Sequence, residues 1–193
     1  MLLKEIFMKN QNGLSIPRRN FIASSVLLGS GLFCMNLPVG SSIPGSQEAK
    51  ERLSSDEKKW VEDSAMAKDL GNYFGKGFSC AESLFMVSLR YLGQPEEWVW
   101  AAAGFGGGLY HRNLCGFLTA GIMALGCASG MQKMPRKEAK ARCGELVKDY
   151  WRWWGSQAPY LCGKIRTKEA TSAVCMNLGF LAAAKIEEML ERV

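Results

Sequence analysis

Seven cysteines give this 193-residue chain its main capacity for chemistry. Thiols can bind metal ions or clusters, exchange disulfides, or pack as small apolar side chains. The sequence contains neither CxxC nor CxxCH, so it lacks the usual signatures of thioredoxin-type exchange and of covalent haem attachment. It has a single histidine, His111, which excludes a histidine-rich metal site and is interpreted as an exposed loop residue.

Two of the cysteines are predicted to lie at helix N-termini. Cys80 follows Ser79, which forms a capping box with Glu82, and Cys115 follows Asn113, a good N-cap residue. The free amide groups and the dipole of a helix N-terminus stabilise a thiolate and lower the pKa of the thiol. The pattern therefore favours Cys80 and Cys115 as ligands or nucleophiles.

The other cysteines of the main domain fall in different settings. Cys162 lies in a predicted loop at 159–163, and Cys175 lies on the inner face of the last predicted helix. Cys127 and Cys143 are interpreted as packing residues. A site built from residues 80, 115, 162 and 175 would take one side chain from each of four elements. Four sulfurs around one point would indicate a metal site, and two pairs with Cα atoms within about 7 Å would indicate disulfides, whereas scattered cysteines would indicate packing alone.

The elements that position these cysteines are predicted to be helices. Apolar residues recur at helical spacing from residue 56 onwards, and no segment shows the alternation of a strand. We therefore expect an all-α fold, a compact bundle of five or six helices. Trp151 and Trp154 are both placed on the core side of their helix. The predicted helices cover residues 56–74, 79–93, 96–104, 114–125, 135–154 and 168–192.

The first 41 residues resemble a twin-arginine signal peptide. Arg18 and Arg19 precede a weakly apolar run at 21–37, and small residues follow at 38–42. This order predicts export to the periplasm or another extracytoplasmic space, followed by a linker at 42–55 and a helical domain at 56–193. The twin-arginine route carries folded proteins, often with a cofactor already bound, so it favours a cofactor in this chain.

The positive charge of the chain is shared between the signal and the domain. The formal net charge is +6, and half of it belongs to residues 1–41. The remaining domain is nearly balanced and has no recognition motif, so we expect no nucleic-acid partner. The apolar run at 21–37 is interrupted by Ser and Gly, so we expect no stable membrane span once the signal is removed.

Four stretches carry a resemblance to a known family. They are FSCAESLF at 78–85, GFGGGLYHRNLCGFLTAGIMALG at 104–126, YLCGKI at 160–165 and SAVCMNLGFLAAAKIEEML at 172–190. In order and context they resemble the redox-active protein family with the C_GCAxxG_C_C motif, over about residues 65–192. The sequence departs from the family's CGAxxG at two positions, with Phe117 for Ala and Ala120 for Gly.

The resemblance implies a cofactor and a set of ligands. The family is similar to the C-terminal domain of split-Soret cytochromes, which implies an iron–sulfur cluster, [2Fe–2S] or [4Fe–4S], without covalent haem. The implied ligands are Cys80, Cys115, Cys162 and Cys175. The expected function is that of a small exported protein that transfers electrons to a redox partner protein.

Two alternatives stay open at this point. One is a thiol–disulfide redox protein that uses Cys80 or Cys115 as the attacking thiolate. The other is a helical interaction module whose cysteines form disulfides or bind structural zinc. The sequence also leaves open whether the chain is an enzyme and whether it forms a homodimer.

Overall fold

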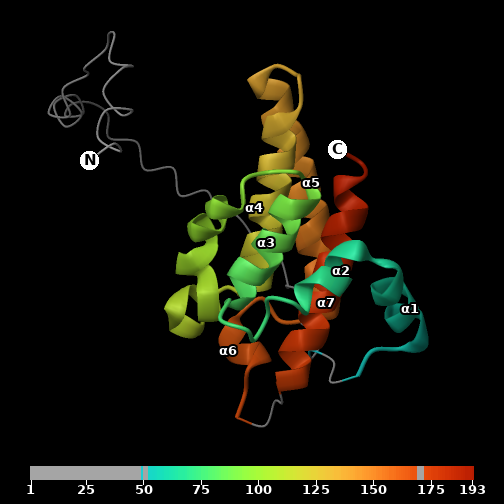
Figure 1. The fold of residues 1–193 in the computed structure, drawn as a ribbon, viewed down its shortest axis with the longest axis vertical. Coiled ribbons are helices and arrows are strands. Elements are labelled where there is room, and N and C mark those ends of the chain that lie inside the picture. Colours follow the sequence, from blue (N-terminus) through green and yellow to red (C-terminus); the bar gives the residue numbers. More distant parts are fainter. Residues whose placement is uncertain (1–48, 50–51, 169–171) are drawn as a thin grey trace, which may run out of the picture. The chain divides into compact units, whose positions relative to one another are not determined.

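The regular structure of this chain is helical throughout the part that the computed structural model describes, which is residue 49 and residues 52–168 and 172–193 (Figure 1). Within it, only two isolated bridges pair extended segments, Phe74 with Phe78 and Leu114 with Leu161. The all-α prediction is therefore confirmed.

The elements are α1 (Ser55–Asp63), α2 (Ala65–Leu70), α3 (Cys80–Tyr91), the 3-10 helix η2 (Glu96–Phe105), the irregular segment η3 (Gly108–Arg112), α4 (Gly116–Met131), α5 (Arg136–Gln157), α6 (Cys162–Ile165) and α7 (Ser172–Leu190). The predicted signal peptide and most of the predicted linker lie outside the described residues.

The first predicted helix is divided into two at Ser64. The Ser64 hydroxyl accepts a hydrogen bond from the Ala67 amide and caps α2. Glu187 of α7 accepts hydrogen bonds from the Ser64 hydroxyl and from the Met66 amide, the latter at 2.9 Å. A carboxylate at a helix N-terminus is favoured by the helix dipole. This contact attaches α2 to the last helix of the bundle.

The fourth predicted helix is longer than expected. The sequence predicted its end at about Leu125, whereas α4 continues through Gly126 to Met131. A glycine inside a helix costs about 1 kcal/mol relative to alanine. The packing of α4 against α3, α5 and α7 outweighs that cost.

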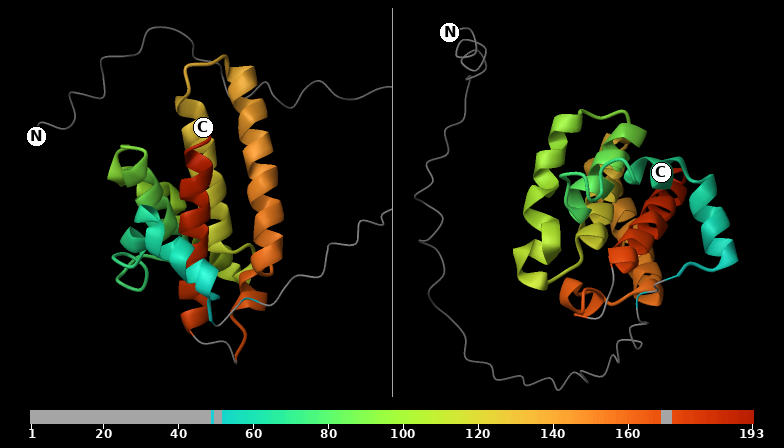
Figure 2. Two further views of the ribbon diagram at one scale, coloured as in Figure 1. Left: turned by 90° about the vertical axis from the view of Figure 1, so that its right-hand side faces the viewer. Right: turned by 60° about the horizontal axis from the view of Figure 1, so that its bottom comes forward.

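The core lies between α3, α4, α5 and α7. The long helices α4 and α5 run antiparallel beside each other (Figure 2). The Tyr150 ring of α5 packs against Gly121 of α4, where an added Cβ would lie 2.5 Å from the ring. The Tyr150 hydroxyl donates a hydrogen bond to the Phe117 carbonyl at 3.2 Å, which satisfies its buried oxygen.

The tryptophans of α5 differ in part from the prediction. Trp154 is fully buried, as expected. Trp151 is 38 % exposed and stacks on Tyr160 with ring centroids 4.5 Å apart, so its placement in the core was wrong. Trp153 packs on the core instead, with its ring stacked on Tyr150.

None of the helices in the described part of the chain has the length and apolar character needed to cross a membrane.

Candidate functional site

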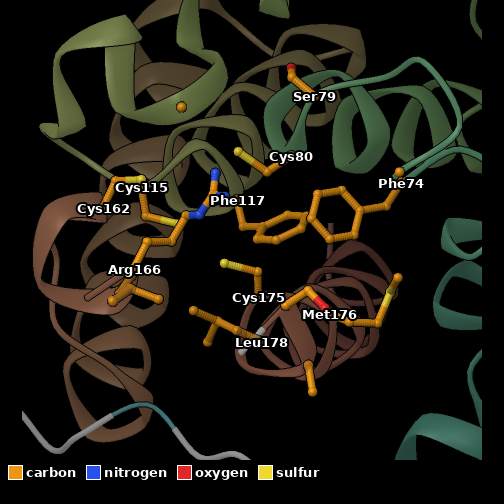
Figure 3. A pocket seen from close by; sticks show the side chains of 15 residues that line it. Phe74, Ser79, Cys80, Cys115, Phe117, Cys162, Arg166, Cys175, Met176 and Leu178 are labelled. Atoms are coloured by element: carbon orange, nitrogen blue, oxygen red, sulfur yellow. The ribbon is translucent and has the colours of Figure 1, made fainter. Parts of the chain in front are cut away.

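One cavity of about 640 Å³ is lined by all four of the cysteines that the sequence singled out (Figure 3). Cys80 comes from α3, Cys115 precedes α4, Cys162 begins α6 and Cys175 lies in α7. Their spacing in the sequence is only a weak signal of a common site, yet the fold brings all four to one cavity. Apart from the cysteines, the lining is mainly apolar, including Phe74, Phe117, Ile165, Met176 and Leu178.

The capping box places Cys80 as predicted. The Ser79 hydroxyl accepts a hydrogen bond from the Glu82 amide at 3.3 Å, and the Glu82 carboxylate accepts one from the Ser79 amide at 2.9 Å. Cys80 is therefore the first residue of α3. The reciprocal capping fixes where the helix begins and so fixes the position of this thiol.

A short antiparallel pairing holds Cys115 and Cys162 beside each other. The Cys115 amide donates to the Tyr160 carbonyl at 2.9 Å, and the Cys162 amide donates to the Asn113 carbonyl at 2.6 Å. Successive side chains of an extended segment point to opposite sides. Both cysteines therefore lie on the side opposite Leu161, and each is only 5 % exposed.

The pairing also changes two local predictions. Cys115 itself occupies the N-cap position of α4, whereas the Asn113 side chain accepts a hydrogen bond from the Leu114 amide at 2.8 Å. Cys162 begins the short helix α6 rather than lying in a loop. Both differences follow from the contact between two segments that are far apart in the sequence, which local capping rules do not include.

Two glycines allow the backbone to approach the cysteines. A Cβ added to Gly116 would lie 2.5 Å from the Cys80 sulfur, and a Cβ added to Gly108 would lie 2.6 Å from the Cys162 Cβ. Gly108 also has a φ of +68°, which favours glycine. The Cys-Gly pair of the motif and the glycine-rich stretch before it are therefore both needed for close packing at the site.

The motif's two departures are accommodated by the packing of α4. The Phe117 ring lies 5.2 Å from the Phe74 ring and against Gly179, where an added Cβ would lie 2.6 Å away. Gly121, one place later than the family's glycine, faces Tyr150. The close packing around these positions is thus made with aromatic rings.

The backbone before Cys115 is strained. Leu109, Tyr110 and Arg112 have φ values of 59°, 58° and 55°, in the left-handed region. This conformation costs about 1–2 kcal/mol for a residue with a Cβ. It is held by a hydrogen bond from the Asn113 amide to the Gly108 carbonyl at 2.9 Å. Apart from the preceding glycines, the sequence carries no signal for it.

Burial is the largest influence on the pKa of Cys115, Cys162 and Cys175. It raises the pKa of Cys115 well above the ordinary value, and the negative charge of Cys80 raises it further, against the opposing effect of the Phe117 and Leu118 amides. Burial also raises the pKa of Cys162 and of Cys175. The expectation that its helix N-terminus would give Cys115 a lowered pKa was therefore wrong, because desolvation outweighs the helix.

Arg166 is a site residue that sequence reasoning missed. It is the one charged side chain that lines the cavity in the described part of the chain, and Figure 3 shows its guanidinium directed toward the cysteines. Its positive charge lowers the pKa of both Cys162 and Cys175, in opposition to burial. A basic residue four positions after Cys162 is too common a pattern to be a signal by itself.

The remaining candidates lie away from the cavity. Cys127 and Cys143 are half-buried and line no part of it, which fits their interpretation as packing residues. His111 is exposed, as expected. No three His, Cys, Asp or Glu side chains among the described residues surround a point where a single metal ion would bind. The six described cysteines are free thiols.

The burial of Cys115 predicts slow and pH-dependent alkylation. In the reduced, metal-free protein, we expect iodoacetamide to label Cys115 at least about tenfold more slowly than in urea, because the thiol is both buried and protonated. Its rate should still be rising at pH 10, where an unperturbed thiol has reached its plateau. Peptide mass spectrometry measures the label at each cysteine, and equal rates for Cys115 in the native and urea-treated protein would contradict the prediction.

Comparisons with known proteins agree with the site. No curated protein and no solved structure matches the chain. The family model described as "Putative redox-active protein (C_GCAxxG_C_C)" matches residues 78–189, a segment that contains all four cavity cysteines. Since the match covers more than half of the chain, the protein belongs to the C_GCAxxG_C_C family of redox-active proteins.

Proposed function

We propose that the protein carries electrons through an iron–sulfur cluster bound by Cys80, Cys115, Cys162 and Cys175. The observation that carries the proposal is that these four side chains, from four separate elements, line a single cavity. The redox character of the family agrees with it. The N-terminal sequence adds export by the twin-arginine route to the proposal.

The chemistry of the cavity fits such a group. Four cysteine thiolates are the usual ligands of [2Fe–2S] and [4Fe–4S] clusters. A cluster distributes its ligands over several iron atoms, so they need not surround a single ion as zinc ligands do. When bound, the cluster would supply a centre that accepts and releases single electrons. The apolar side chains of the lining would limit the contact of this centre with water, and Arg166 would offset its negative charge.

Binding of the cluster would release protons from the cysteine thiols. Only the thiolate binds metal, and burial holds the Cys115 thiol in its protonated form at neutral pH. Cluster binding therefore displaces a proton from Cys115, and the affinity of the site should rise with pH. The cysteines otherwise act as fixed ligands, positioned by the capping box at Ser79 and by the pairing of residues 113–115 with 160–162.

One observation favours thiol–disulfide exchange as a second candidate. Cys115 and Cys162 come from paired extended segments and lie on the same side of that pairing. However, the attacking group in such exchange is a thiolate, and burial raises the pKa of both thiols. We therefore place this function second.

Iron and sulfide content tests the two candidates. The protein purified without oxygen is expected to contain iron and acid-labile sulfide in equal amounts and to absorb visible light. Replacing any one of the four cavity cysteines by serine should remove most of both, because a cluster needs all of its thiolates. Cys127→Ser and Cys143→Ser are the matched controls, since these thiols lie outside the cavity. Zinc without iron, or a disulfide between Cys115 and Cys162, would refute the proposal.

A further inference from the structure

The surface over the Cys115–Cys162 pairing is basic. Arg112 lies before Cys115, and Lys164, Arg166 and Lys168 follow Cys162; all four are exposed. The sequence has no Asp or Glu from residue 98 to 137 or from 150 to 168, and the next acid, Glu169, lies outside the described residues. The domain as a whole is nearly balanced in charge, so this local excess is not a consequence of its composition.

Of these four cations, Arg166 lines the cysteine cavity, and Arg112 is bound to Arg166. The Arg112 guanidinium donates a hydrogen bond to the Arg166 carbonyl at 3.2 Å, which connects the η3 segment to the end of α6. The Arg112 backbone packs against Gly163, where an added Cβ would lie 3.2 Å from its carbonyl oxygen. Arg112 and Arg166 both act on the Cys162 thiol, whose pKa they lower.

Apolar side chains lie among the same charges. Tyr110 is 75 % exposed and lies shortly before the paired segment at 113–115, and Leu161, itself one of the two paired residues, is 42 % exposed. Tyr110 is held outward by a left-handed backbone that costs free energy. Exposed aromatic residues and arginines are enriched at protein interfaces. We define the basic face as Tyr110, Arg112, Leu161, Lys164, Arg166 and Lys168.

We propose that the basic face is the docking surface for a protein partner with an acidic surface. Charge complementarity would steer such a partner to the wall behind which Cys115 and Cys162 lie. A small anion would use the cations alone, whereas Tyr110 and Leu161 offer contact area outside the cavity that only a macromolecule can cover. That the partner exchanges electrons through this contact rests on the proposed function. That the partner is acidic rests on the charges of the basic face alone.

The chain contains its own control for non-specific attraction. The N-terminal part of α5 and the turn before it carry an equally basic and exposed stretch at residues 133–142, with a single acid, Glu138. None of its lysines and arginines lines the cysteine cavity. An acidic probe attracted by charge alone should therefore bind this stretch as well as the basic face.

Nuclear magnetic resonance with two probe proteins tests the proposal. The isotope-labelled protein is titrated with an acidic ferredoxin and, separately, with a basic cytochrome c, at low and at moderate salt. We expect the ferredoxin to shift amide signals of residues 108–114 and 160–168, at low salt more than at moderate salt. Shifts centred on residues 133–142, or equal shifts with both probes, would overturn the proposal.

Paired variants measure the contribution of the charges. Arg112→Gln combined with Lys164→Gln is expected to weaken ferredoxin binding about three- to tenfold. Lys137→Gln combined with Lys140→Gln, the matched control on α5, should leave it unchanged. Equal effects of the two pairs would refute the assignment. If the protein lacks iron but still binds ferredoxin at the basic face, the proposed function is refuted and the docking surface stands. If the protein contains iron and sulfide but binds ferredoxin at another surface, the docking surface is refuted and the proposed function stands.

Discussion

Gly116→Ala is expected to prevent the proposed iron–sulfur cluster from binding and to lower the free energy of unfolding by about 1–3 kcal/mol, the usual cost of overpacking. The new methyl group would lie 2.5 Å from the Cys80 sulfur and 3.0 Å from both the Ala81 nitrogen and the Phe105 oxygen. Two of these three neighbours are backbone atoms, which cannot rotate away. The sulfur must move instead, and its displacement takes a ligand of the proposed cluster out of its place in the cavity.

A second glycine of the same helix provides the control. Gly126 also lies in α4, but an added Cβ there meets no atom within 4 Å. Gly126→Ala should therefore raise the free energy of unfolding, by up to about 1 kcal/mol, because alanine is the better helix former. Urea unfolding and iron content per chain measure both effects. If Gly116→Ala retained full iron content and wild-type stability, the close contact with Cys80 would not be a requirement of the site.

The elements of the fold that sequence reasoning predicted well are those specified by local patterns. The capping box of Ser79 and Glu82 places Cys80 at the first position of α3, because both hydrogen bonds lie within one helical turn. Pro135 correctly predicts the start of α5, where a missing amide hydrogen has no cost. Local signals of this kind are contained in a few consecutive residues, so a single sequence is enough to recognise them.

The parts that sequence reasoning missed depend on contacts between distant segments. The backbone pairing of Leu114 with Leu161 joins residues 47 positions apart. An isolated pairing between two such short segments produces no periodic pattern in the sequence that would predict it. The pKa of Cys115 was predicted in the wrong direction for the same reason. A helix N-terminus can be read from the sequence, but the burial that outweighs it is created by the whole fold.

The selection of the four cavity cysteines rested partly on local patterns and partly on the family motif. Helix position distinguished Cys80 and Cys115, and local setting led to the interpretation of Cys127 and Cys143 as packing residues. The family motif added that Cys162 and Cys175 are ligands, and the fold places these two in the cavity and Cys127 and Cys143 outside it. Arg166 lies just outside the motif stretch at 160–165, so only the structure shows that it lies beside the thiols.

Trp154→Ala is expected to cost about 3–5 kcal/mol, the usual loss for a fully buried tryptophan, and to loosen the cysteine site as well. The indole packs against the rings of Tyr150 and Trp153, and its Nε1–H donates a hydrogen bond to the Pro159 carbonyl at 3.1 Å. This bond anchors the chain just before Tyr160, whose carbonyl accepts from Cys115. Loss of the indole therefore removes core packing and a support of the Cys115–Cys162 pairing together.

Two further variants separate these contributions. Trp154→Phe keeps an aromatic ring but lacks the Nε1–H, so we expect a smaller loss of stability but still a faster alkylation of Cys115 and Cys162 by iodoacetamide. Trp100→Ala is the control for the residue type, since Trp100 is 76 % exposed, and should change the free energy of unfolding by less than about 0.5 kcal/mol. Urea midpoints and site-resolved alkylation rates measure both. If Trp154→Phe left the two alkylation rates unchanged, the bond to Pro159 would serve the core alone, and the paired backbone of residues 113–115 and 160–162 would hold the cysteines without it.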